Sequence, residues 1–74
     1  MITSIDHTGQ LCTLTHNGHA VTAGEILENF RGDHYRVTGG RAPHKDGSTG
    51  QIYTDAGNYY PTVFNCKWTP TKGA

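Results

Sequence analysis

Ten glycines interrupt the 74-residue chain, and they limit the fold more than any other feature of the sequence. They leave no window in which apolar residues recur at the i, i+3, i+4 and i+7 spacing of an amphipathic helix. The segments between them are rich in Ile, Val, Thr and Tyr, which favour strands over helices. The sequence therefore predicts an all-β domain built from short strands and tight turns.

Alternation of apolar and polar residues, with turn signals between the runs, locates the expected elements. Strands are predicted at 2–6, 10–15, 34–39 and 49–54, with strand-like residues within 20–30 and a last strand ending at Trp68. Asn17-Gly18 predicts a hairpin turn because both residues tolerate positive φ. We interpret Arg31-Gly32-Asp33 as a tight turn rather than an adhesive tripeptide. Residues 55–58 form another turn, and Pro61 begins one short 3-10 turn.

A chain of this length makes one domain with one small core. We expect that domain to span residues 1–70 and residues 71–74 to form a frayed tail. A sheet this small must close or fold over to hide its edges and bury one face. The expected architecture is a small, partly open SH3-like barrel of five or six strands, with an OB-like barrel as the second possibility.

The charges balance overall but cluster locally. Six Lys and Arg residues match six Asp and Glu residues, which disfavours nucleic-acid binding driven mainly by counterion release. Four of the six cations nevertheless lie within one short stretch that also contains two histidines. These residues are Arg31, His34, Arg36, Arg41, His44 and Lys45. They form either a local basic face or an ordinary solvated surface.

The longest segment without a large apolar residue is 39–50, "GGRAPHKDGSTG". A phosphate-binding P-loop is excluded because Gly47 is followed by Ser48-Thr49 without a lysine, and the next element is a strand. The segment is either a plain connection between strands or a binding loop. In the second case Arg41, His44 and Lys45 would face a partner, since loops of this length are often functional.

Catalytic and metal chemistry find little support in the sequence. A zinc site could be drawn from Cys12, His16, His19 and Cys66, but the chain has no Cys-x-x-Cys pair. No cysteine or serine occupies a nucleophile motif. We therefore expect no enzyme activity, no catalytic residue, no metal and no cofactor. The two cysteines are expected to be reduced thiols, although the sequence leaves a disulfide between them open.

Aromatic residues near the cations are the best candidates for contacts with a partner. Tyr35, Tyr53 and Trp68 could be core residues or part of a stacking surface. Tyr59 and Tyr60 are neighbours in an extended segment, so at least one of them should be exposed. The predicted partner-binding residues are Arg36, Arg41, His44, Lys45, Tyr59 and Tyr60.

Nothing in the sequence points to a membrane or to secretion. No run approaches the ~18 apolar residues of a membrane helix. The N-terminal residues lack a basic region followed by an apolar run, so no signal peptide is expected. A cytoplasmic protein is the prediction.

Residues 24–68 carry a series of spaced motifs: "FRG" followed by an acidic residue, a proline-containing loop ending "GSTG", and "YPTVFNCKW". This pattern resembles a group of small phage- and prophage-encoded proteins, and it is similar to KOW or SH3-like modules. The resemblance implies a small β-barrel in the cytoplasm of a phage host, and it brings no active-site residues with it.

Three functions follow from these observations as expectations. The first is a non-catalytic phage protein that binds and modulates a host or defence protein. The second is a KOW-like module that binds nucleic acid or a ribonucleoprotein, which the zero net charge disfavours. The third is a structural component of a virion or oligomer. The sequence leaves the oligomeric state open.

Overall fold

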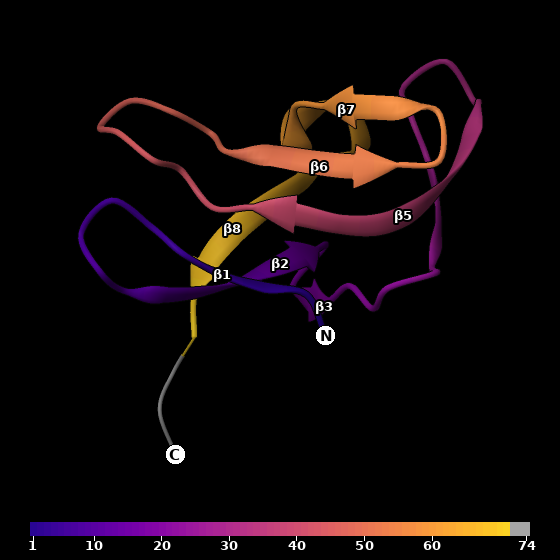
Figure 1. Cartoon of the computed structure of the whole chain (residues 1–74). Helices are drawn as coiled ribbons and strands as arrows, with labels where there is room; N and C mark the ends of the chain where they lie inside the picture. Colours follow the sequence, from indigo (N-terminus) through magenta and orange to yellow (C-terminus); the bar gives the residue numbers. More distant parts are fainter. Residues whose placement is uncertain (72–74) are drawn as a thin grey trace.

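The computed structural model describes residues 1–71, which form two four-stranded antiparallel sheets (Figure 1). The first sheet contains β1 (Thr3–Ile5), β2 (Leu11–His16), β3 (His19–Ala20) and β8 (Cys66–Pro70). Strand β2 lies at its centre. Strands β1 and β3 pair with its two halves along one edge, and β8 pairs along the other.

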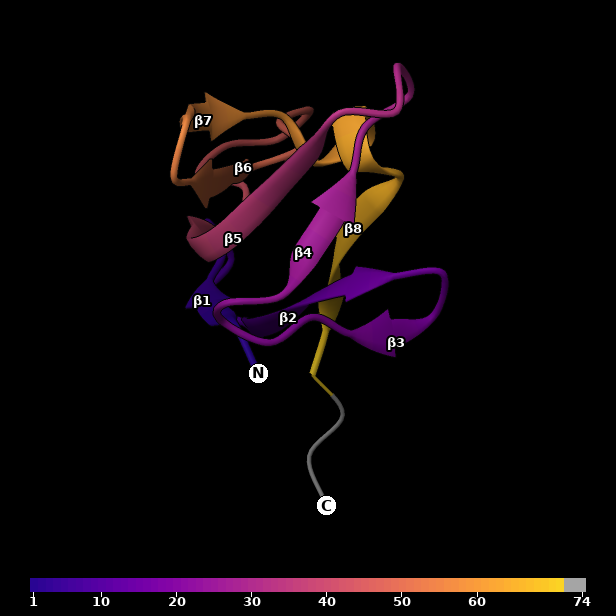
Figure 2. The same cartoon turned by 90° about the vertical axis from the view of Figure 1, so that its right-hand side faces the viewer.

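The second sheet contains consecutive strands. They are β4 (Ile26–Glu28), β5 (His34–Arg41), β6 (Gln51–Thr54) and β7 (Gly57–Tyr59). The 3-10 helix η1 (Pro61–Phe64) then leads the chain into β8, which returns to the first sheet. In Figure 1 the β5–β7 strands lie above β1–β3, and β8 runs from one group to the other; Figure 2 shows the same arrangement from the side.

The core lies between the two sheets. Leu14, Val21, Val37, Ile52 and Phe64 have at most 1% of their surface exposed. Each side chain of this size contributes about 1.5–3 kcal/mol when it is fully removed from water. An aromatic cluster packs against this core, with the rings of Tyr35, Tyr59 and Phe64 at centroid distances between 5.2 and 5.8 Å.

Two turns follow directly from their residues. Asn17 and Gly18 have φ angles of 51° and 86° and join β2 to β3, which confirms the predicted hairpin. Gly32 has a φ of 85° in the turn between β4 and β5, as expected for that tripeptide. Asn65 takes a left-handed conformation after η1, and its side-chain amide donates to Asn17 Oδ1 at 2.9 Å. This bond connects the end of η1 to the β2–β3 turn.

The prediction of an all-β domain is confirmed, as is the 3-10 turn that begins at Pro61. Residues 1–71 contain eight strands rather than the expected five or six, because the shortest strands, such as β3 and β7, are too brief to show alternation. Strand β7 begins at Gly57, so the predicted turn at 55–58 is narrower than expected. Within residues 1–71 the two sheets do not join into a closed ring of strands.

The predicted frayed tail lies mostly outside the described residues, which end at Thr71. The Thr71 amide donates to the Leu11 carbonyl oxygen at 2.9 Å, and its hydroxyl pairs with that of Thr13. Thr71 therefore continues the pairing of β8 with β2.

Candidate partner-binding face

The loop between β5 and β6, residues 42–50, is fixed at its base. Ala42 is buried, and its amide donates to Ser4 Oγ at 2.9 Å. The Pro43 carbonyl accepts a hydrogen bond from the His7 amide at 2.9 Å. The Ser48 amide donates back to the Lys45 carbonyl at 3.2 Å. Strand β1 and the turn after it therefore hold the first residues of the loop, whereas 44–47 are exposed.

Trp68 of β8 packs beneath both ends of this loop. A Cβ atom on Gly40 would lie 2.7 Å from Trp68 Cζ2, and one on Gly50 would lie 2.7 Å from Trp68 Cδ1. Both distances are far below van der Waals contact, so only glycine lets the indole approach the backbone this closely. The indole nitrogen is buried and has no hydrogen-bond acceptor among the described residues.

This packing corrects one interpretation of the sequence. The strand predicted at 34–39 ends at the glycine pair Gly39-Gly40, where the segment 39–50 begins. Instead, β5 continues through both glycines to Arg41, with Gly40 paired with Ile52. Gly40 is therefore required for packing rather than for a turn. Gly50 serves both purposes, because its φ is 78°.

A hollow of about 210 Å³ opens beside the loop. Four of the six residues predicted to bind a partner line it: Arg41, His44, Lys45 and Tyr60, together with Ala42, Ser48, Gly50 and Gln51. No carboxylate is among these residues. The single ion pair within residues 1–71 is His34 with Glu28, at 3.6 Å, so Arg41 and Lys45 have no acidic partner.

A second hollow of about 330 Å³ adjoins the first, and its walls are Gln51, Asn58, Tyr59, Tyr60 and Val63. The two hollows share Gln51 and Tyr60 as lining residues, so they lie next to each other. Tyr60 is 63% exposed and immediately precedes Pro61, the first residue of η1. We call the two hollows together the Tyr60 groove.

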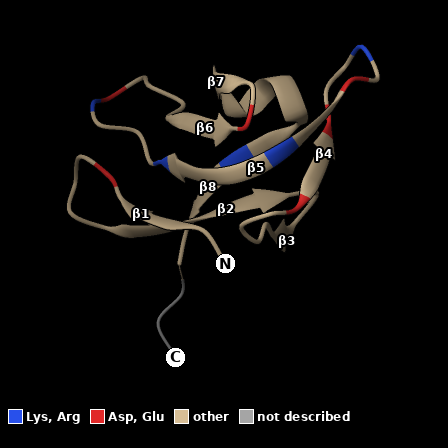
Figure 3. Cartoon of the chain, turned by 45° about the vertical axis from the view of Figure 1, so that its right-hand side comes forward, with Lys and Arg blue, Asp and Glu red and all other residues tan. Residues whose placement is uncertain are grey.

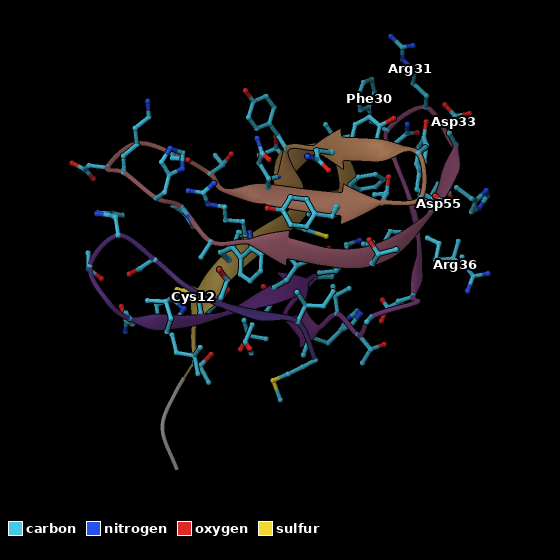
Figure 4. The ribbon with its side chains drawn as sticks, in the orientation of Figure 1. Cys12, Phe30, Arg31, Asp33, Arg36 and Asp55 are labelled. Carbon is cyan, nitrogen blue, oxygen red and sulfur yellow. The ribbon has the colours of Figure 1, made fainter. Side chains whose placement is uncertain are left out.

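The other two predicted residues have different environments. Arg36 lies on β5 opposite Ile26, and five residues of extended chain place it about 16 Å from Arg41. Figure 4 shows Arg36 near Asp55 at the end of the molecule that carries Arg31 and Asp33. Tyr59 is half-buried in the aromatic cluster, and it also lines the second hollow.

The expected local basic face is therefore divided. Figure 3 shows Lys and Arg both on the β5–β6 loop and, at the opposite end of the molecule, on the turn between β4 and β5. Acidic residues lie near both sets (Figure 3). The β4–β5 turn precedes β5 and the β5–β6 loop follows it, so the length of this strand separates the two groups of basic residues.

The candidate zinc residues do not form a metal site in residues 1–71, although His16 lies beside both His19 and Cys66. Within residues 1–71 no three His, Cys, Asp or Glu side chains are placed to share a metal ion. Cys12 and Cys66 are both buried and free, so they form no disulfide. In the register of β2 and β8, Cys12 lies opposite Pro70 and Cys66 lies opposite His16.

Both thiols are held in the neutral form. Burial raises the pKa of the Cys66 thiol to about 11. Burial also raises the pKa of Cys12, helped by the Asp6 carboxylate, which accepts a hydrogen bond from its sulfur at 3.5 Å. Neither thiol is activated as a nucleophile.

Sequence reasoning missed parts of the groove. Gln51, Asn58 and Val63 carry no charge or aromatic ring, and only their position in the fold brings them beside Tyr60. Phe30 is a large apolar side chain, yet it is 78% exposed at the tip of the β4–β5 turn, 5.6 Å from the Arg31 guanidinium. Its place beside a tight-turn signal was the available clue.

Comparison with known protein families, with characterised proteins and with solved structures finds no match to this chain. Across residues 1–71 no helix combines the length and apolar character needed to cross a membrane. The function must therefore be argued from the groove itself.

Proposed function

We propose that this is a non-catalytic phage protein that binds and modulates a host or defence protein in the host cytoplasm, using the Tyr60 groove as its contact face. One observation carries the proposal. Arg41, His44, Lys45 and Tyr60 line the same hollow, and neither Arg41 nor Lys45 has an acidic partner in the part of the chain that the structure describes. Arg and Tyr are among the residues that contribute most to protein–protein interfaces.

The size of the groove favours a partner's side chains over a small molecule. Its hollows of about 210 and 330 Å³ lie below and just above the lower limit of about 300 Å³ for small-molecule sites. Tyr60, which lines both hollows, is exposed, and this suits contact with a surface. The anchored loop base keeps the face in one shape, so little conformational entropy is lost on binding.

The strand order supports an SH3-like barrel in its partly open form as the architecture. Strands β5, β6 and β7 follow one another as a meander, η1 stands between β7 and β8, and β8 returns to pair with β2. The 42–50 loop then corresponds to one of the loops that such a scaffold presents to partners.

A capture experiment tests the proposal. The tagged protein is incubated with lysate of a bacterial host, and the retained proteins are identified by mass spectrometry. The groove variant changes Arg41, His44, Lys45 and Tyr60 to Ala. The matched control changes Phe30, Arg31, His34 and Arg36 to Ala, which removes the same number of cations, histidines and aromatic rings from the opposite end.

We expect one specific protein to be retained by the wild type and the control variant but lost by the groove variant. Retention by all three proteins would show that the contact face lies elsewhere. Circular dichroism of both variants provides the folding control, since all eight substituted residues are exposed.

The KOW-like nucleic-acid module is the second candidate, because Arg41, Lys45 and Tyr60 combine cations with a ring that could stack on a base. The division of the basic residues between two ends weakens it, along with the zero net charge. Fluorescence anisotropy with single- and double-stranded oligonucleotides at low salt decides the question. Binding below ~50 µM would favour this candidate, since non-specific binders reach that range.

A further inference from the structure

The Tyr60 groove has two chemically different halves. The half beside the loop contains Arg41 and Lys45 and no carboxylate. Asp46 follows Lys45 directly in the sequence, yet it neither lines the hollow nor pairs with Lys45 within 4.0 Å. A partner that covered these two cations without supplying an anion would bury uncompensated charge, which is strongly unfavourable.

The other half is formed mainly by apolar and aromatic surface. Tyr59 and Val63 are both half-buried and pack against the core, so their positions are fixed from beneath. With Tyr60 they line an open hollow whose other residues are Gln51 and Asn58. A side chain with no charge that packs here would remove apolar surface of both partners from water.

Building on the proposed function, we infer that the groove recognises an extended peptide segment that carries an anionic side chain next to an apolar one. The anionic group lies between Arg41 and Lys45, and the apolar side chain fills the space beside Tyr59 and Val63. The shared wall of Gln51 and Tyr60 requires the two side chains to be close along the peptide.

The chemistry of each half sets the selectivity. An Arg guanidinium binds a carboxylate through two parallel hydrogen bonds, and the Ser48 hydroxyl and the Gln51 amide lie in the same hollow as further donors. A phosphorylated serine offers the same anionic chemistry, so the experiment must compare both anions. A single-stranded nucleic acid supplies the anion but no apolar side chain, and this difference separates the two classes of partner.

Fluorescence anisotropy with labelled peptides in a Gly-Ser background tests the inference. One peptide set carries one Asp and one Leu separated by about one to four residues of extended chain. Matched sets replace Asp with Lys, Asp with phosphoserine, or Leu with Ser. We expect at least one spacing of the Asp–Leu or phosphoserine–Leu peptides to bind roughly 10- to 100-fold more tightly than the Lys–Leu and Asp–Ser peptides.

Variants of the protein connect this selectivity to the two halves. Arg41→Glu with Lys45→Glu should reverse the preference, so that the Lys–Leu peptides bind and the Asp–Leu peptides do not. Val63→Ser should remove the discrimination between Leu and Ser while leaving that between Asp and Lys. Arg31→Glu with Arg36→Glu is the control, because it makes the same charge change at the opposite end of the molecule and should alter neither preference.

Two results would overturn the inference. The first is equal binding of Asp–Leu and Lys–Leu peptides at every spacing. The second is no binding of any peptide at ~1 mM protein. Neither result would contradict the proposed function, which is tested by the capture experiment. That proposal fails only if the groove variant, with Arg41, His44, Lys45 and Tyr60 changed to Ala, retains the same host protein as the wild type.

Discussion

The contact between Trp68 and the backbone of Gly40 can be tested by adding a single methyl group. In Gly40→Ala the new carbon would lie 2.7 Å from Trp68 Cζ2 and 2.8 Å from the Gln51 carbonyl oxygen. Favourable carbon contacts lie at about 3.5–4.0 Å, so one of these neighbours must move. The oxygen belongs to the paired β5–β6 backbone, and the partly buried indole packs against the core. We therefore expect the full cost of overpacking, about 1–3 kcal/mol of unfolding free energy.

Gly39→Ala is a matched control one residue away on the same strand. Its Cβ would have Tyr53 Cδ2 as its nearest neighbour at 3.7 Å, which is an ordinary contact. Neither glycine has a positive φ, so alanine fits both backbones. The control should be neutral or more stable than the wild type by up to about 1 kcal/mol, because alanine lowers the entropy of the unfolded chain.

The assay is urea denaturation followed by fluorescence, for which Trp68 is the single tryptophan and lies at the site of the change. With an m-value of about 1 kcal/mol/M for so small a domain, Gly40→Ala should lower the midpoint by about 1–3 M. The same change would lower the melting temperature by about 4–8 °C for each kcal/mol.

Trp68→Leu in the Gly40→Ala background should recover part of the lost unfolding free energy. The smaller side chain removes the close contact of the new methyl group with the indole, whereas its contact with the Gln51 carbonyl oxygen remains. Equal midpoints for Gly40→Ala and Gly39→Ala would refute the packing of the indole against the strand. A coupling energy of zero between positions 40 and 68 would show that the indole is not the obstacle.

Three further predictions concern the rest of the molecule. Leu14→Ala should lower the unfolding free energy by about 2–5 kcal/mol in urea titrations, because Leu14 is fully buried between the sheets; a smaller loss would mean that the core collapses around the cavity. The Asp6 carboxylate has a pKa lowered from 3.8 to about 2, chiefly by the Thr8 hydroxyl that donates to it at 2.6 Å. Its folded pKa lies below its unfolded value, so its stabilising effect is present above pH 4 and is lost as the pH falls towards 2. Melting curves of Asp6→Asn should lack that part of the pH dependence, and identical profiles for the two proteins would contradict it. Finally, Cys12 and Cys66 should react with iodoacetamide at least ~10-fold more slowly in the folded protein than in urea at neutral pH, since burial keeps both thiols neutral and covered; equal rates would disprove their burial.

The sequence indicated the longer strands because their alternation extends over enough residues to be seen. The observed β2 begins and ends within one residue of the predicted strand at 10–15, and in β5 Tyr35 and Val37 share the inner face as expected. Short strands such as β3 and β4 depend on pairing with distant partners, which no local pattern reveals. The packing of the two sheets against each other depends on such distant contacts as well.

The same distinction applies to the candidate site. Arg41, His44 and Lys45 could be grouped in advance because they lie within five residues of one another, at the end of β5 and in the loop that follows. Their proximity to Tyr60 depends on the path of the chain through β6, β7 and the start of η1. Arg36 seemed equivalent to Arg41 because the two are close in the sequence. A strand rises about 3.3 Å per residue, however, so the five positions between them span much of the molecule.

The position of β2 at the centre of its sheet has a consequence for how the protein is made. One edge of β2 is filled by β1 and β3, which are synthesised early, and the other edge by β8, which is synthesised last. Until residues 66–70 leave the ribosome, β2 keeps an open edge and the loop glycines have no indole beneath them. A nascent chain is thus exposed to strand-to-strand aggregation during translation. The ends of the loop beside the groove take their final packing only after Trp68 has been added, so the proposed binding would require synthesis of this region to be complete.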